Sequence, residues 1–176
     1  LDVGPGDWVW TSPNTFVASA NCALYCGAKV DFVDIDPRTY NMSVERLAGK
    51  LESAKAANLL PKVVIPVHFA GQPCDMSTIY KLSQEYGFKI IEDASHAIGA
   101  SYSIPKSGKN AQRQSTTFNA SEMNHPTERI SIGSCIHSHI TVFSFHPVKI
   151  ITTGEGGMAL TNDAELAERM FRLRTH

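Results

Sequence analysis

Lys149 is the residue whose sequence surroundings most suggest covalent chemistry. It lies between an apolar run, Ile140–Phe145, and a glycine-rich turn at 154–157 that leads into a second apolar run, Met158–Leu160. Desolvation disfavours an ammonium and lowers the pKa of a lysine, which makes its amine a nucleophile toward carbonyl carbons. Because most lysines are solvated, the spacing alone favours an exposed lysine over a reactive one. The turn is not a Walker-type phosphate loop, since no Gly-Lys-Ser/Thr follows it.

Two acidic residues follow a short apolar run in the middle of the chain. The run Phe88–Ile91 predicts a buried parallel strand, and Glu92 and Asp93 stand at its carboxyl end, where open α/β sheets bind ligands. His96 follows shortly after. An acid in this place either caps the next helix or holds the ring nitrogen of a cofactor protonated. The segment alone does not separate these two roles.

A third segment places an aromatic residue at the start of a helix. We predict a strand at Trp8–Thr11, a turn, a helix over Phe16–Cys26 that ends at Gly27, and a strand at Val30–Val33. Phe16 can either stack on a planar ring or fill the core. Without further context the core is favoured.

The alternation of strands and helices predicts the fold class. Further elements are expected at Ser43–Ala56 (helix), Val63–Val67 (strand), Met76–Tyr86 (helix) and Ala164–Leu173 (helix). This order predicts an α/β fold with a doubly wound, mostly parallel sheet flanked by helices. On the last helix, Glu165 and Arg169 have the spacing of an i, i+4 ion pair.

The composition is that of a soluble catalytic domain. The chain has 176 residues, of which 43% are hydrophobic and 19% are charged, and its net charge is −1. This length favours one domain, and the charge gives no reason to expect nucleic acid or a membrane as a partner. No apolar run approaches the ~20 residues of a membrane span, and the start of the chain does not resemble a signal peptide.

The four cysteines are expected to be structural. Cys22 and Cys26 lie four residues apart on a predicted helix, but no second pair at ligand spacing completes a zinc site. These two, with Cys74 and Cys135, are therefore expected to be buried free thiols. Free thiols indicate a cytoplasmic location.

The histidines are likewise expected to be hydrogen-bonded or exposed rather than metal ligands. His137 and His139 are two residues apart and share one face if they lie on a strand, and His68 follows the predicted strand at 63–67. No HExxH motif is present, and no carboxylate stands at ligand spacing. We therefore expect no metal site.

The stretch Ser103–Arg129 differs from the rest of the chain. It is rich in Ser, Thr, Asn, Gln and Lys and shows little apolar periodicity. It is long for a loop in a compact domain, and we expect an insertion of roughly 20–30 residues there. A disordered surface excursion is favoured over a lid or a dimer contact near Asp93.

Five motifs in this order resemble the DegT/DnrJ/EryC1/StrS family of sugar aminotransferases, which use pyridoxal 5′-phosphate (PLP) on a fold-type I scaffold. They are SPNTFVASAN, DFVDID, IPVHFAGQPCDM, IIEDASHAIGA and VFSFHPVKIITTGEGGMALTND. The combination of motifs is specific, whereas no single one is. EDASHA together with SFHPVKIITTGEGG is most similar to the subgroup that aminates UDP-4-keto-6-deoxy-N-acetylhexosamines on the way to pseudaminic acid.

The resemblance implies a role for five residues. Lys149 matches the lysine that attaches PLP covalently and shuttles the proton during amino transfer. Asp93 matches the carboxylate that pairs with the protonated pyridine nitrogen, which lets the ring accept electron density. Phe16 matches the aromatic residue that stacks on the ring. His96 matches the residue beside the phenolic oxygen, and Ser144 matches a hydroxyl that binds the phosphate.

The resemblance also implies a reaction and its partners. An amino acid, glutamate in this family, gives its amino group to PLP, and the 4-keto carbon of a nucleotide-linked deoxysugar then receives it. Family members that are dehydratases carry His in place of the lysine, so Lys149 argues against that branch. Fold-type I sites form between two subunits, which implies a homodimer. His146 and Glu155 lie close to the lysine in sequence, and no role follows for them.

By the same resemblance, residues 1–176 are part of the large, PLP-binding domain. The N-terminal segment that binds the PLP phosphate and the smaller C-terminal domain are expected to be absent from this chain. Three alternatives stay open: an inactive fragment that only dimerises, a PLP enzyme acting on a non-sugar substrate, and a plain nucleotide-binding domain. The absence of GxGxxG argues against the last of these.

Overall fold

The protein is seen in a computed structural model, which describes residues 1–105 and 127–174. Its elements, in chain order, are β1 (Trp8–Thr11), α1 (Ala18–Tyr25), β2 (Lys29–Phe32), α2 (Val44–Ala57), β3 (Val63–Ile65), the short 3₁₀ turn η1 (Phe69–Gly71), α3 (Met76–Tyr86), β4 (Lys89–Asp93), β5 (Ser101–Pro105), β6 (Thr127–Ser131), β7 (Ile140–Ser144), β8 (Gly157–Leu160) and α4 (Ala164–Arg174).

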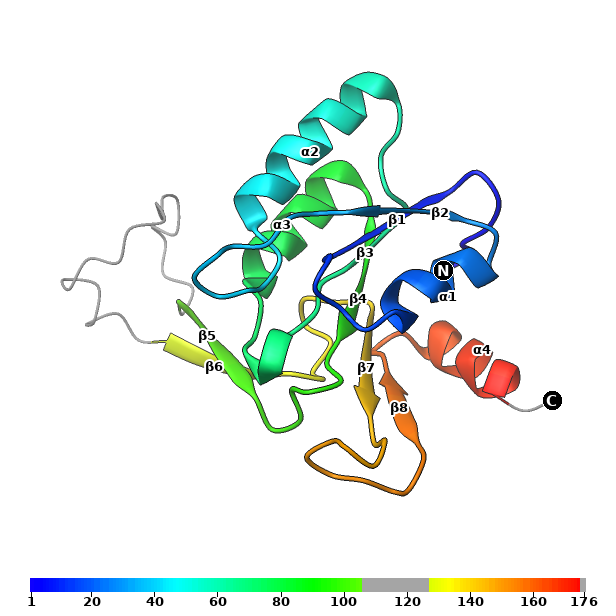
Figure 1. Ribbon diagram of the computed structural model, residues 1–176, viewed down its shortest axis with the longest axis vertical. Coiled ribbons are helices and arrows are strands. Elements are labelled where there is room, and N and C mark those ends of the chain that lie inside the picture. Colours follow the sequence, from blue (N-terminus) through cyan, green and yellow to red (C-terminus); the bar gives the residue numbers. More distant parts are fainter. Residues whose placement is uncertain (106–126, 175–176) are drawn as a thin grey trace.

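Six of the strands form one sheet in the order β2-β1-β3-β4-β7-β8, and β5 and β6 form a separate antiparallel pair. Every neighbouring pair in the large sheet is parallel except β7 with β8. Figure 1 shows α2 and α3 on one side of this sheet and α1 and α4 on the other. The predicted doubly wound, mostly parallel α/β fold is therefore confirmed.

Side-chain alternation along the strands divides the core into two layers. Trp10, Val64 and Ile90 point toward α2 and α3, where they pack with Leu47, Leu51, Met76 and Ile79. Val9, Val63 and Ile65 point the other way and pack with Ala23 of α1. Because the strands are buried on both faces, their sequences read as short continuous apolar runs.

Local sequence determines where the helices begin and end. The Ser43 hydroxyl accepts a hydrogen bond from the amide of Arg46 and caps α2, which ends at Asn58 in the left-handed conformation. Asp75 caps α3 through the amide of Thr78, and Gly87 ends it with φ +80°. The predicted range of α3 agrees with the observed one, and that of α2 lies within one residue.

Leu51 tests how much the α2 layer contributes to stability. Its side chain has no exposed surface, and it lies among Trp10, Leu47 and Ile79. Leu51→Ala is expected to lower the free energy of unfolding by about 2–5 kcal/mol, because apolar burial is lost and a cavity is left. Urea unfolding measures this change. Glu52→Ala on the exposed side of the same helix is the control and should change it by less than about 0.5 kcal/mol.

Two local predictions are wrong. Cys22 and Cys26 are exposed, whereas Ser19 and Ala23 of α1 are buried; Cys74 and Cys135 are buried as predicted. The Glu165–Arg169 pair does not form. Arg169 instead binds the carboxylate of Asp2, and the pair with i, i+4 spacing on α4 is Glu168 with Arg172.

The insertion at 103–129 stays a prediction. Its two ends lie in strands β5 and β6, where Ser103 pairs with Arg129 and Pro105 with Thr127. The remainder, 106–126, lies outside the described residues. Within the described residues, no helix is long and apolar enough to cross a membrane.

Candidate active site

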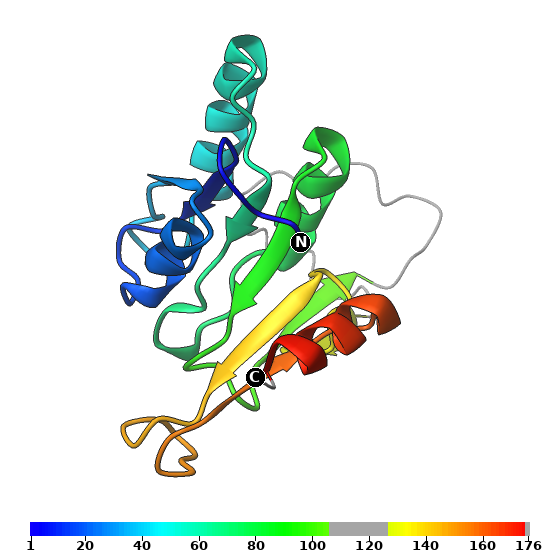
Figure 2. The ribbon, with the colours of Figure 1, turned by 90° about the vertical axis from the view of Figure 1, so that its right-hand side faces the viewer.

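The predicted site residues other than Phe16 lie where β4 and β7 end or on the loops that follow these strands. Asp93 is the last residue of β4 and stands opposite Val142 in the parallel register with β7. Ser144 ends β7, and the chain then forms the loop 145–156, which extends beyond the ends of the strands (Figures 1 and 2). This loop carries Lys149. The carboxyl edge of the sheet therefore brings together residues that are more than 50 positions apart in sequence.

Two hydrogen bonds orient the Asp93 carboxylate. One oxygen accepts from the Ser19 hydroxyl of α1 at 2.6 Å, and the other accepts from the amide of Ser95 at 3.1 Å. The Thr15 hydroxyl in turn donates to Ser19 at 2.9 Å. Among the described residues, no cationic side chain makes an ion pair with Asp93. Its oxygens retain free lone pairs, so this carboxylate can accept a further, cationic donor.

Lys149 lies against His96. Its Nζ is 2.6 Å from Nε2 of His96, which follows Asp93 by three residues. An ammonium can only donate, so Nε2 accepts this bond and the imidazole proton is placed on Nδ1. The contact places the Lys149 amine against the loop that follows Asp93. Lys149 is half-buried, whereas the flanking Val148 and Ile150 are 78% and 72% exposed.

The two remaining predicted site residues are Phe16, which precedes α1, and Ser144, which ends β7. Phe16 lies in the turn before α1, where its carbonyl accepts from the amide of Ser19, and its side chain is 76% exposed. The core alternative for Phe16 is therefore wrong, and its ring is free to contact a ligand. The Ser144 hydroxyl is half-buried and accepts a weak bond from the amide of His146 at 3.4 Å.

Glycines allow the backbone to pack closely around the site. A Cβ at Gly71, whose φ is +86°, would lie 2.7 Å from the carbonyl oxygen of His96. A Cβ at Gly157 would lie 2.9 Å from the carbonyl oxygen of Phe143. The turn η1 thus supports the His96 loop directly, and only glycine permits this contact.

Sequence reasoning did not identify Ser19 and Thr15 as site residues. Serine in the interior of a helix is common, and only its position three residues after Phe16 relates it to the site. The predicted hydrogen-bonded state of two histidines is confirmed. His139 accepts from the amide of Ile90, and His137 shares a 2.7 Å bond with the Tyr102 hydroxyl.

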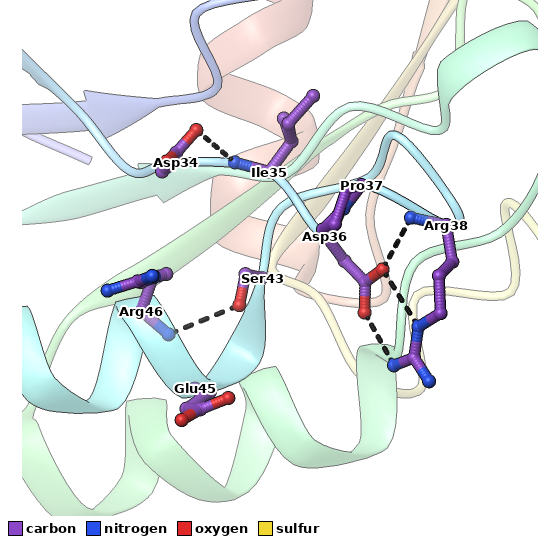
Figure 3. A pocket seen from close by; sticks show the side chains of 8 residues that line it. All are labelled: Asp34, Ile35, Asp36, Pro37, Arg38, Ser43, Glu45 and Arg46. Carbon is purple, nitrogen blue, oxygen red and sulfur yellow. Dashed lines mark hydrogen bonds and ion pairs between the residues drawn. The ribbon is translucent and has the colours of Figure 1, made fainter.

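A hollow of about 480 Å³ lies elsewhere, beside the start of α2. Figure 3 shows its lining, in which Arg38 binds the carboxylate of Asp36 and holds the pKa of that group at about 2. Asp34, Glu45 and Arg46 also line it, so its charges are mixed, and it includes none of the predicted site residues. No group of three or more His, Cys, Asp or Glu side chains in the described part of the chain is arranged to hold a metal ion.

The whole chain is similar to one family of known proteins. The model of the DegT/DnrJ/EryC1/StrS aminotransferase family matches residues 1–176. GDP-perosamine synthase of Caulobacter vibrioides is 40% identical over 174 residues, which are 99% of this chain and 38% of that protein. The chain thus spans about two fifths of the length of this curated relative.

Solved structures show the same fold. A DegT/DnrJ/EryC1/StrS aminotransferase from Brucella abortus has a TM-score of 0.76 at 32% identity, over 99% of this chain and 40% of that one. Helicobacter pylori PseC, an aminotransferase involved in the biosynthesis of pseudaminic acid, has a TM-score of 0.71 at 29% identity, over 97% and 37%. NtdA from Bacillus subtilis, solved with bound cofactor PMP, has a TM-score of 0.69 at 26% identity, over 94% and 30%.

Proposed function

Because this chain belongs to the DegT/DnrJ/EryC1/StrS aminotransferase family, we propose that the whole protein moves an amino group from an amino acid to a keto carbon of a nucleotide-linked sugar with the help of PLP. One observation carries this proposal. Asp93, a carboxylate without a cationic partner among the described residues, lies three residues from His96, which contacts Lys149. An acid and an amine at one sheet edge are the two protein groups that PLP chemistry needs.

The residues present fit the cofactor. Lys149 would hold it covalently, Asp93 would pair with its ring nitrogen, and exposed Phe16 would stack on the ring. Ser144 would bind the phosphate, and His96 would lie beside the phenolic oxygen. The open face of Phe16 and the free lone pairs of Asp93 support this assignment. When bound, PLP supplies an electron sink for the charge that develops on the substrate.

The residues of this chain then have separate tasks. The Lys149 amine would act as the proton carrier at the substrate carbon. His96 Nε2 accepts from Nζ and orients the amine for this transfer. Ser19 and the Ser95 amide both donate to the Asp93 carboxylate and would hold it in place toward the ring nitrogen.

The substrate is proposed more finely from the sequence motifs. The EDASHA and SFHPVKIITTGEGG motifs support a UDP-4-keto-6-deoxy-N-acetylhexosamine, a precursor of pseudaminic acid, as the acceptor and glutamate as the donor. The similarity to PseC agrees with this assignment. The similarity to GDP-perosamine synthase makes a GDP-linked 4-keto sugar the acceptor to test beside it.

We place residues 1–176 in the PLP-binding large domain of a longer, cytoplasmic, homodimeric protein. The matched relative is more than twice as long as this chain. Val148, Ile150 and Ile151 of the Lys149 loop are all exposed, which suits a loop that another subunit or domain covers. The activity is proposed for that whole protein.

Amino transfer is tested directly on the whole protein supplied with PLP. Incubation with glutamate and either UDP-4-keto-6-deoxy-N-acetylhexosamine or a GDP-4-keto-6-deoxyhexose should release 2-oxoglutarate in step with an amino sugar, both measured by mass spectrometry. If an amino sugar forms from only one of the two nucleotide-linked keto sugars, that sugar identifies the subgroup. Release of 2-oxoglutarate with neither sugar, but with an added keto acid, would show a PLP enzyme of non-sugar substrates. No 2-oxoglutarate under any of these conditions would refute the proposal.

A further inference from the structure

A buried polar cluster lies directly behind the candidate site. It consists of Glu92, His68 and Thr141, called the Glu92 cluster below, whose exposed fractions are 2%, 1% and 0%. The three residues come from the neighbouring strands β4 and β7 and from the segment that follows β3. Glu92 and Thr141 stand opposite each other in the parallel register, so their side chains lie side by side on one face of the sheet.

Both partners of Glu92 contact the same carboxylate oxygen. The Thr141 hydroxyl donates to Oε2 at 2.9 Å, and Nε2 of His68 is 3.6 Å from it. Nδ1 of His68 accepts from the amide of Cys74 at 3.1 Å, so the imidazole proton is placed on Nε2, the atom that faces Glu92. Among the described residues, this buried Nε2 makes no hydrogen bond, and Oε2 of Glu92 at 3.6 Å is the charged group it faces.

The Glu92 cluster lies on the opposite face of the sheet from the candidate site. Glu92 shares a face with Ile90, which packs on α2 and α3, whereas Asp93 points to the other face and meets Ser19 of α1. The two faces are joined through the backbone. The amide of Asp93 donates to the Pro66 carbonyl at 2.9 Å, and the amide of His68 donates to the Asp93 carbonyl at 3.0 Å.

One short piece of chain therefore holds the end of β4 in two ways. The segment 66–68 bonds to the backbone of Asp93, and its histidine side chain faces the residue immediately before Asp93. A shift of Glu92 must move the Asp93 carboxylate, whose short bond to Ser19 tolerates little displacement. Stability alone does not explain an acid and an imidazole in an apolar layer, because hydrophobic replacements of such groups are often neutral or stabilising.

We propose that Glu92, His68 and Thr141 are positioning residues, which fix the end of β4 so that the Asp93 carboxylate meets the ring nitrogen of the cofactor. This inference rests on the proposed function. The cluster acts through Asp93 and touches neither substrate nor cofactor. Loss of such supporting contacts typically costs 10- to 100-fold in activity or affinity, and a misplacement of about 1 Å has a similar effect.

The test compares Glu92→Leu with Glu92→Gln in the whole protein. Glu92→Leu removes the acceptor and is expected to lower kcat by about 10- to 100-fold, with KM for glutamate changed by less than about threefold. Glu92→Gln keeps an oxygen for Thr141 and His68 and should retain kcat within about threefold of the wild type. Ile79→Val, in the same apolar layer but away from the cluster, is the control for lost stability.

A second measurement does not depend on catalysis. Amide hydrogen exchange in the cofactor-free protein should be faster at His68 and Asp93 in Glu92→Leu than in the wild type, and unchanged there in Ile79→Val. If Glu92→Leu does not fold, Thr141→Val removes one donor without changing the shape of the side chain and should give the same effects more weakly.

The outcomes separate the two proposals. Suppose that the wild type is active and that Glu92→Leu has the same kcat and the same rates of amide exchange as Ile79→Val. This result would overturn the positioning role. An inactive wild type would refute the proposed function. It would also refute the proposal that the Glu92 cluster positions Asp93 for amino transfer. Faster exchange at Asp93 in that case would still show that the cluster holds the end of β4.

Discussion

Replacing Lys149 by alanine is expected to abolish covalent attachment of PLP and to lower kcat by at least about 10³-fold. Lys149 is the amine that meets His96 on the loop after β7, at the same sheet edge as Asp93. Loss of a group that acts both as a covalent attachment point and as a proton carrier has effects of this size or larger. The measurement is the visible absorbance of the protein with PLP, before and after borohydride.

The wild type is compared with Lys149→Ala and with a control variant at another lysine. The wild type should show a borohydride-sensitive band and then carry one reduced cofactor on the peptide that contains Lys149. Lys149→Ala should show neither. Lys81→Ala changes an exposed lysine of α3 and should behave like the wild type. A reduced cofactor attached to another lysine in the wild type would return Lys149 to an ordinary surface role.

The sequence predicted the scaffold of the site because that scaffold depends on local patterns. The apolar run before Asp93 predicted a buried strand, and the order of strands and helices predicted a parallel sheet. In such a sheet, an acid that ends a central strand must lie at the ligand-binding edge. The position of Asp93 therefore followed from pattern alone, whereas its proposed role needed the resemblance to a family.

Contacts across long sequence separations could not be predicted. The bond between Ser19 and Asp93 joins residues 74 positions apart, and the bond between Thr141 and Glu92 spans 49. Serine and threonine are common in helices and strands, so nothing local distinguishes these two. The partners became visible only when register and helix placement put their side chains on the same face of the sheet.

Exposure was predicted poorly for the same reason. Cys22 and Phe16 are apolar or weakly polar residues on or before α1, and burial is the default expectation for such side chains. Both are exposed, and the buried residues of α1 are Ser19 and Ala23. The sequence pattern of a helix predicts which of its faces packs on the sheet. Whether its other faces are covered depends on other segments or on partners, which that pattern does not contain.

Asp93→Asn is expected to lower kcat by roughly 10²- to 10⁴-fold, the range that follows loss of one preorganised charge or donor in other enzymes. Asparagine has nearly the same shape, its oxygen can still accept from the Ser95 amide, and its NH2 group can donate to the Ser19 hydroxyl, so the fold should be retained. It cannot neutralise a protonated ring nitrogen. The cofactor ring then loses its positive charge and accepts electron density less readily.

Two measurements show whether charge or shape is responsible. Steady-state rates of amino transfer give kcat, and the thermal unfolding midpoint reports any loss of structure. A large fall in kcat with an unchanged midpoint supports the electrostatic role of Asp93. Ser19→Ala removes one orienting bond but leaves the charge, so its kcat should lie between those of the wild type and Asp93→Asn. If Asp93→Asn keeps wild-type kcat, Asp93 is a structural residue at the end of β4, and the cofactor must be held elsewhere.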